Sequence, residues 1–181
     1  QAFANVNTGL GNQLRRVAKL IEARAVLGAK RQIFMVSMGG YDTHENEVAG
    51  QGQRFMELSN ALRAFDTAMT AVQASNQVTA FTLSDFGRTL RPTDSGTDHA
   101  WGNHHLIMGG AVKGATTYGT MPTLALGGPD DADNSGRWIP TTSVDQYGAT
   151  LAQWFGVAPA NLAAIFPNLA RFPTPNLGFM T

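Results

Sequence analysis

The sequence contains no cysteine, which excludes disulfide bonds, thiolate zinc sites and cysteine nucleophiles. It has no excess of either charge, since 13 basic and 13 acidic residues give a formal net charge of zero. Without a basic stripe or a run of like charges, neither a nucleic-acid partner nor an electrostatic membrane partner is expected. No apolar run approaches the ~20 residues of a transmembrane helix. Ordinary apolar content and 181 residues instead favour one domain, residues 1–181, with a buried core.

Apolar residues recur at helical spacing in two stretches. In residues 10–27 they recur every three or four positions, and Gly28 is a typical helix stop. In residues 51–74 the same spacing runs from Phe55 to Val72, and this stripe indicates core packing rather than cofactor binding. A third helix is predicted from the capping-box sequence Ser143–Gln146, and a short fourth helix follows it.

Two short apolar runs are typical of buried strands. Gln32–Met38 ends at a pair of glycines, and Val78–Leu83 ends at Ser84-Asp85. The order strand, helix, strand predicts a right-handed crossover in a parallel sheet covered by helices. Further short strands are considered at residues 104–110 and 123–126, within a stretch rich in loops.

Histidine and aspartate side chains gather after the predicted strands. Asp42 and His44 follow the first strand, Asp85 ends the second, and His99 lies in the next loop. Ligands bind beyond the carboxyl ends of strands in open α/β sheets, so these groups are expected to meet at one edge. Imidazole and carboxylate together suit zinc, manganese or iron better than calcium. Three or four such ligands would serve one ion, and four to six would serve two.

Each of these residues also has a structural interpretation, as a turn, cap or surface residue. His104 and His105 are adjacent, so on a strand they would face opposite sides, and one of them is expected to be structural. Arg88 is either a surface charge or, beside a metal, a bidentate holder of an anionic oxygen. The acidic run 130–134 lacks the order of an EF-hand and is interpreted as a solvated turn.

Four motifs resemble the DUF1501 family. They are Gly40-Tyr41-Asp42-Thr43-His44, Leu83-Ser84-Asp85-Phe86-Gly87-Arg88-Thr89, the stretch 96–102 and the stretch 109–114. In that family the corresponding pieces read G-W-D-T-H, S-E-F-G-R-T, G-T-D-H-G-W-G and G-G-x-V-K-G-G. The resemblance covers roughly residues 5–180 and would correspond to the C-terminal half of a typical member.

DUF1501 proteins are in turn similar to the alkaline phosphatase and sulfatase superfamily. This resemblance implies a three-layer α/β/α sandwich with a largely parallel sheet, of which this chain would be a part. It implies metal-dependent hydrolysis of phosphate or sulfate esters, carried by a small molecule or a polymer. Family members often carry a twin-arginine export signal, which implies a periplasmic or secreted protein, although the chain itself shows no signal pattern.

The resemblance also implies roles for individual residues. Asp42 and His44 stand where the superfamily has Asp-x-x-x-His, but with one residue between them. Asp85 ends a strand as in Ser-Asp-His-Gly, with Phe86 at the place of a metal-binding histidine, and His99 matches the final histidine. The implied ligands of a divalent ion, most simply zinc with manganese, iron or calcium as alternatives, are Asp42, His44, Asp85, His99 and, as an auxiliary, His104. Arg88 would be the catalytic residue that holds the anion.

One departure from the superfamily pattern keeps an alternative open. The superfamily nucleophile, a serine or threonine, normally lies in an N-terminal half that this chain does not contain. The site would then be completed by a missing N-terminal segment of the same protein or by a partner. The alternative is an exported, non-catalytic structural or binding protein with the same fold. A sugar-binding domain using Trp101 and Trp138 is a weaker third interpretation.

Overall fold

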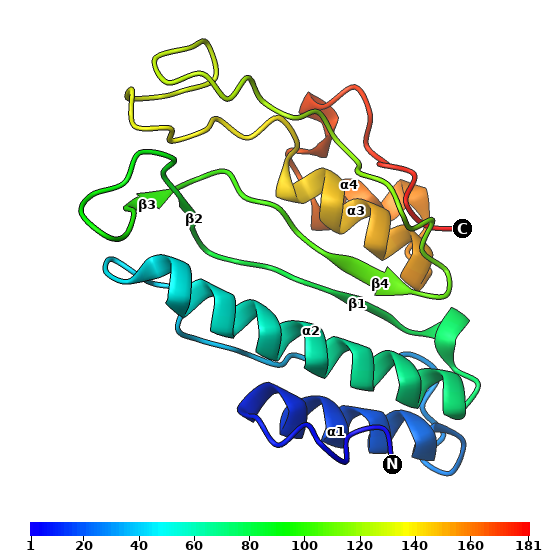
Figure 1. Ribbon diagram of the computed structural model, residues 1–181. Helices are drawn as coiled ribbons and strands as arrows, with labels where there is room; N and C mark the ends of the chain where they lie inside the picture. Colours follow the sequence, from blue (N-terminus) through cyan, green and yellow to red (C-terminus); the bar gives the residue numbers. More distant parts are fainter. The chain divides into compact units, whose positions relative to one another are not determined.

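The computed structural model describes residues 1–181, and the chain divides into two compact units (Figure 1). The first unit comprises Gln1–Val78 and Pro92–Asp98, and the second comprises Thr79–Arg91 and His99–Thr181. The chain therefore leaves the first unit after Val78, returns at Pro92, and leaves it again after Asp98.

The first unit is built on two packed helices, α1 (Gly9–Glu22) and α2 (Glu47–Ala71) (Figure 1). The two helices predicted from apolar spacing are thus confirmed, although α2 begins before the first residue of its apolar stripe. α1 begins where the Thr8 hydroxyl accepts a hydrogen bond from the Gly11 N–H at 3.1 Å. Short 3₁₀ helices follow each of them, η1 (Ala23–Ala25) and η2 (Ser75–Gln77).

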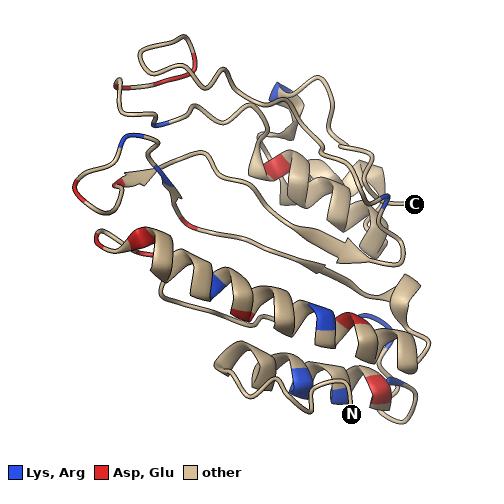
Figure 2. Cartoon of the chain, in the orientation of Figure 1, with Lys and Arg blue, Asp and Glu red and all other residues tan.

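The face that α1 buries carries the predicted apolar stripe. Its buried residues are Leu10, Gly11, Leu14, Ala18 and Ile21. Both helices carry basic and acidic residues, with basic residues in the majority on α1 (Figure 2). None of the chain's helices combines the length and the apolarity needed to cross a membrane.

The predicted strand at residues 32–38 is not a strand in the structure. Residues 31–43 form neither helix nor strand, and the side chains of Ile33 and Met35 are 79% and 93% exposed. Within residues 32–38 only the backbone of Ser37 forms hydrogen bonds, and its partner is a side chain. Its N–H donates to Gln13 Oε1 at 3.0 Å, and its carbonyl accepts from Gln13 Nε2 at 2.8 Å.

The second unit contains two small antiparallel sheets. β1 (Thr79–Phe81) pairs with β4 (Ile107–Gly109), so that Ala80 lies opposite Met108. β2 (Gly87–Arg88) pairs with β3 (His99–Ala100). No strand forms at residues 123–126.

The predicted α/β/α sandwich with a largely parallel sheet is therefore wrong. The structure has two separate two-stranded sheets, both antiparallel, and no parallel pair. A strand is stable only where another strand satisfies its backbone groups, and residues 32–38 have none. Residues 78–83 do contain a strand, but its partner comes from residues that follow it and run in the opposite direction.

The helices of the second unit all lie after residue 143, and no helix forms between β4 and that point. α3 (Val144–Phe155) has the predicted capping box, in which the Gln146 N–H donates to Ser143 Oγ at 3.1 Å and the Ser143 N–H donates to Gln146 Oε1 at 3.0 Å. Shorter helices follow as η3 (Pro159–Asn161), α4 (Leu162–Ile165) and η4 (Leu169–Arg171). The main apolar cluster of the second unit joins Tyr147 and Leu151 of α3 to Phe179, which is 1% exposed.

Candidate metal site

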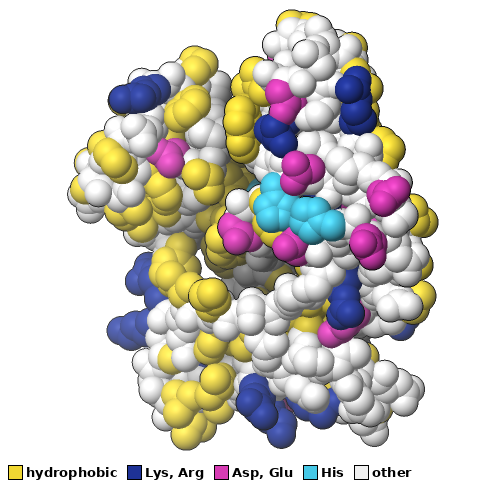
Figure 3. Space-filling model, turned by 90° about the vertical axis from the view of Figure 1, so that its left-hand side faces the viewer, with side chains coloured by type: hydrophobic (Ala, Val, Ile, Leu, Met, Phe, Trp, Pro, Cys, Tyr) yellow, Lys and Arg dark blue, Asp and Glu magenta, His cyan; other side chains and the backbone are white.

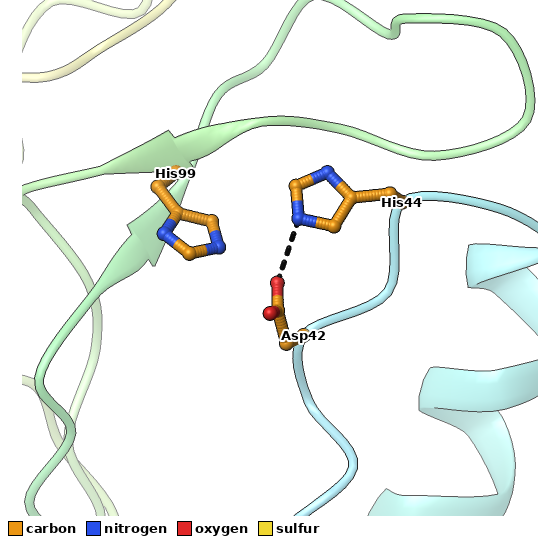
Figure 4. Close-up of side chains that lie close together, drawn as sticks. All are labelled: Asp42, His44 and His99. Atoms are coloured by element: carbon orange, nitrogen blue, oxygen red, sulfur yellow. Dashed lines mark ion pairs between the residues drawn. The ribbon is translucent and has the colours of Figure 1, made fainter.

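An exposed aspartate–histidine pair lies just before α2 in the first unit. Asp42 Oδ1 and His44 Nε2 are 2.8 Å apart, and the two side chains are 56% and 50% exposed (Figure 4). A side chain of α2 fixes the segment that carries this pair. Gln51 Nε2 donates to the Tyr41 carbonyl at 3.0 Å and to Thr43 Oγ1 at 2.8 Å. A carboxylate and an imidazole, both of which can bind metals, are thus exposed to solvent on a turn that hydrogen bonds hold in place.

The segment 92–98 packs on the backbone next to this pair. Ser95 accepts two hydrogen bonds there, from the Glu47 N–H to its carbonyl and from the Asn46 N–H to its hydroxyl, both at 3.0 Å. The Thr97 hydroxyl donates to Glu47 Oε2 at 2.7 Å. Gly96 approaches His44 so closely that a Cβ at residue 96 would lie 2.2 Å from the His44 carbonyl carbon. A glycine is therefore required at this position.

His99 belongs to the second unit and follows Asp98, the last residue of the first. Its ring stacks on Phe86, with ring centroids 4.3 Å apart and an interplanar angle of 10°. Its carbonyl accepts a hydrogen bond from Arg137 Nε at 3.0 Å. His99 is three positions along the chain from Gly96, and three residues span at most about 11 Å. Covalent continuity therefore keeps His99 close to the contact between Gly96 and His44.

Asp42, His44 and His99 form the group of side chains that could hold a metal ion, each offering one exposed ligand atom (Figure 4). Exposed histidine side chains are also visible in the space-filling view (Figure 3). The group does not include Asp85 or His104, which are both exposed. The ligand roles of all five predicted residues stay predictions, and three of the five belong to this candidate group.

Arg88 lies directly opposite His99 in the pairing of β2 with β3. Residues opposite each other in an antiparallel pair project from the same face of the sheet. The guanidinium carbon of Arg88 lies 5.7 Å from the centroid of the Phe86 ring, which is a cation–π distance. A cation is therefore placed on the face of this small sheet that carries His99.

His105 is the structural member of the adjacent histidine pair. Its half-buried ring stacks on Tyr147 at a centroid distance of 5.5 Å, and its Nδ1 lies 3.4 Å from Thr82 Oγ1. Burial, and secondarily the charge of His104, lowers the pKa of His105. Burial also raises the pKa of the Tyr147 hydroxyl, which donates to the Thr82 carbonyl at 3.3 Å. His105 therefore packs within its own unit, and the ligand role of His104 stays a prediction.

The acidic run 130–134 organises its own loop. Asp131 accepts hydrogen bonds from the N–H groups of Gly127 at 2.9 Å and of Gly136 at 3.0 Å. Desolvation raises the pKa of Asp131, but these and further backbone hydrogen bonds outweigh it and lower the pKa overall. Asp133 forms an ion pair with Arg137. These carboxylates hold the turn in place, and none of them belongs to the candidate metal-ligand group.

Phe86 acts at this site in a way that the sequence did not indicate. The motif comparison marked it as a residue at the place of a ligand, and nothing in its local pattern showed that it packs on His99. The contact arises because β2 and β3 pair across a loop, which sets residues 86 and 99 side by side. Only a prediction of that pairing could have found it.

A family model described as "Protein of unknown function (DUF1501)" matches residues 4–135. The match covers well over half of the chain. The chain belongs to the DUF1501 family. The match includes Asp42, His44, Phe86 and His99, whereas α3 lies beyond it. Comparisons of this DUF1501 protein with curated proteins and with solved structures gave no match.

Proposed function

We propose that this DUF1501 protein binds one divalent metal ion through Asp42, His44 and His99 and uses it to hydrolyse phosphate or sulfate esters. The observation that carries the proposal is the exposed Asp42–His44 pair, with ligand atoms 2.8 Å apart. His99 is tethered close to this pair by the short path from Gly96, whose backbone contacts His44. The family's resemblance to the alkaline phosphatase superfamily supports the same chemistry.

The donor set fits a zinc-type ion. Two imidazole nitrogens and one carboxylate oxygen are a common set for catalytic zinc, which keeps its fourth position open for water or substrate. Because all three side chains are exposed, solvent and an ester can reach an ion held there. Both imidazoles must be neutral to bind, so metal affinity is expected to fall at acid pH. A bound ion would polarise the ester and lower the pKa of its water toward ~7.

Arg88 is proposed to hold the anionic oxygen of the ester. It shares a face of the small sheet with His99, and a guanidinium can donate two parallel hydrogen bonds to a phosphate or sulfate. The proposed substrate is therefore an ester with at least one anionic oxygen next to the scissile bond. The proposed location is the periplasm or the exterior of the cell, as the family resemblance implies.

A second candidate function is a non-catalytic binding or structural role outside the cytoplasm. The observation that favours it is Phe86, which covers a face of His99 at the place where the superfamily pattern has a further ligand. With fewer ligands the ion would be held with less charge stabilisation. In this case the metal, or the exposed polar surface around it, would serve binding alone.

Metal titration of chelator-treated protein tests the metal proposal. Calorimetry with Zn²⁺ is expected to give one ion per chain, and Asp42→Asn, His44→Asn and His99→Asn are each expected to weaken binding by at least about tenfold. Asp66→Asn removes an exposed carboxylate on α2 and serves as the matched control, with unchanged affinity. His104→Asn measures whether His104 is an auxiliary ligand.

Turnover separates the two candidate functions. The zinc-loaded protein is assayed with aryl phosphate and aryl sulfate esters, with Arg88→Lys as a variant that keeps the charge but loses bidentate geometry. Metal-dependent turnover that Arg88→Lys lowers supports the hydrolase. One bound ion without turnover supports the binding role, and the absence of stoichiometric metal refutes the site.

A further inference from the structure

The imidazole of His99 stacks on an aromatic ring of its own unit. Phe86 and His99 stack nearly parallel, 4.3 Å apart at 10°. Offset-stacked rings at this separation attract each other beyond their burial alone. Histidine ligands of metals usually depend on a carboxylate or carbonyl to fix the ring. Here the phenyl ring of Phe86 lies where it can fix the orientation of the imidazole ring.

The backbone of Phe86 is itself firmly placed. Its carbonyl accepts two hydrogen bonds, from Ser84 Oγ at 2.8 Å and from Asn103 Nδ2 at 3.0 Å. The next residue is Gly87, where a Cβ would lie 2.1 Å from the Gly102 carbonyl oxygen. The two chain segments therefore approach each other as closely as glycine allows. This close approach restricts the backbone next to Phe86, and so the position of the Phe86 ring beside His99.

We propose that Phe86 is a positioning residue that fixes the ring plane of His99 for metal binding. A metal–nitrogen bond lies in the plane of the imidazole, so an exposed histidine must give up rotation about its side-chain bonds to bind. The stack restricts that rotation beforehand, and because it covers a face of the imidazole, it leaves the in-plane directions in which the ring nitrogens bind a metal uncovered. The inference rests on the proposed metal site, but the stack can be tested without metal.

Proton NMR of the metal-free protein tests the stack. The chain has 4 histidines, so the carbon-bound ring protons of His99 can be identified by their loss in His99→Asn. We expect these protons to be shifted upfield by the ring current of Phe86, to move downfield in Phe86→Leu, and to stay upfield in Phe86→Tyr. Ring protons of His99 that do not respond to Phe86→Leu overturn the inference.

Zinc affinity of the same variants tests the positioning role. Phe86→Leu is expected to weaken Zn²⁺ binding by about tenfold, as substitution of an outer partner of a ligand does, and Phe86→Tyr is expected to restore it. Phe172→Leu changes another half-buried phenylalanine of the second unit and is expected to bind as the parent does. Circular dichroism and thermal midpoints show that each variant is folded.

The outcomes separate this inference from the proposed function. If the parent protein binds zinc and Phe86→Leu binds it equally well, the positioning role is refuted and the metal site stands. If the parent binds no zinc, the metal site is refuted, whatever the NMR spectra show. Weakened binding in Phe86→Leu, recovered in Phe86→Tyr, supports both.

Discussion

Residues 32–38 in the first unit and residues 78–83 in the second have the same kind of sequence, a short apolar run followed by polar turn residues. In the second unit Thr79–Phe81 forms strand β1, paired residue by residue with β4. In the first unit the equivalent stretch forms no strand, and Gln13 supplies its only backbone hydrogen bonds. Both runs are mainly apolar, and the presence of a partner strand makes the difference.

The two units also hold their proposed ligands in different ways. Asp42 and His44 follow the unpaired stretch, and side-chain hydrogen bonds from Gln51 in α2 fix their turn. His99 lies on a paired strand and is covered by Phe86. The position of a ligand residue in a paired strand is fixed by the neighbouring strand. The position of a ligand residue in a turn is fixed by hydrogen bonds from a few side chains. Variants in the two units should therefore respond differently.

Proline substitution should produce the largest contrast between the two runs. The Thr82 N–H donates to the Leu106 carbonyl at 3.0 Å, so the antiparallel alternation makes Ala80 and Met108 a hydrogen-bonded pair. Ala80→Pro removes that donor and is expected to lower the free energy of unfolding by about 2–3 kcal/mol. Met35→Pro removes an N–H without a partner and is expected to cost less than about 1 kcal/mol. Urea unfolding measures both.

The comparison fails if Met35→Pro is as destabilising as Ala80→Pro, since residues 32–38 would then be paired in solution. Met35→Ala controls for the side chain, which is 93% exposed. It is expected to unfold as the parent does. A large loss in Met35→Ala would show that the stretch is buried against something in solution.

Helix capping provides a second, smaller contrast. Ser143 and Gln146 cap α3 reciprocally, whereas Thr8 caps α1 through one hydrogen bond. Ser143→Ala is therefore expected to lower the free energy of unfolding by about 1–2 kcal/mol, and Thr8→Ala by about 0.5–1 kcal/mol. Urea midpoints together with helical circular dichroism test this order. A Thr8→Ala loss larger than that of Ser143→Ala would reverse it.

The smallest expected effect is a pH dependence that arises in the second unit. Burial, with the charge of His104, lowers the pKa of His105 below its unfolded value of about 6.5. The unfolded chain then binds more protons between those two pKa values, so stability falls as pH drops below about 6.5. His105→Phe keeps an aromatic ring against Tyr147 but cannot titrate. Thermal midpoints at pH 7.5 and pH 5 should therefore differ less in His105→Phe than in the parent.

A matched variant sharpens this prediction. His104→Asn removes one cause of the lowered pKa, so its loss of stability at pH 5 should lie between those of the parent and His105→Phe. An equal pH dependence in all three proteins would show that His105 does not contribute. NMR titration of the His105 ring protons gives the pKa directly.

The helices could be predicted because their signals are local. The stripe from Leu10 to Ile21 needs only the helical repeat, and the capping box at Ser143 needs only four residues. The sheets could not be predicted in the same way. Nothing near residues 78–83 shows that their partner lies at Ile107–Gly109 and runs antiparallel. Pairing depends on contacts between distant residues, and short apolar runs alone do not encode it.

The candidate site likewise has a part that the sequence predicts locally and a part that depends on strand pairing. Asp42 and His44 could be singled out as a pair because one residue separates them, and they do lie 2.8 Å apart. The sequence also marked His99 as a ligand by motif. It gave no sign that Phe86 would cover His99, since that contact follows from the pairing of β2 with β3.

The sequence by itself determined the family, the three main helices and the residue types of the candidate metal site. These depend on composition, motif order and repeats within a few turns of chain. The tertiary structure decided which apolar run becomes a strand, in which direction it pairs, and which neighbour orients His99. Backbone hydrogen bonds and ring stacking need two partners, and the second partner here is chosen by the folded chain.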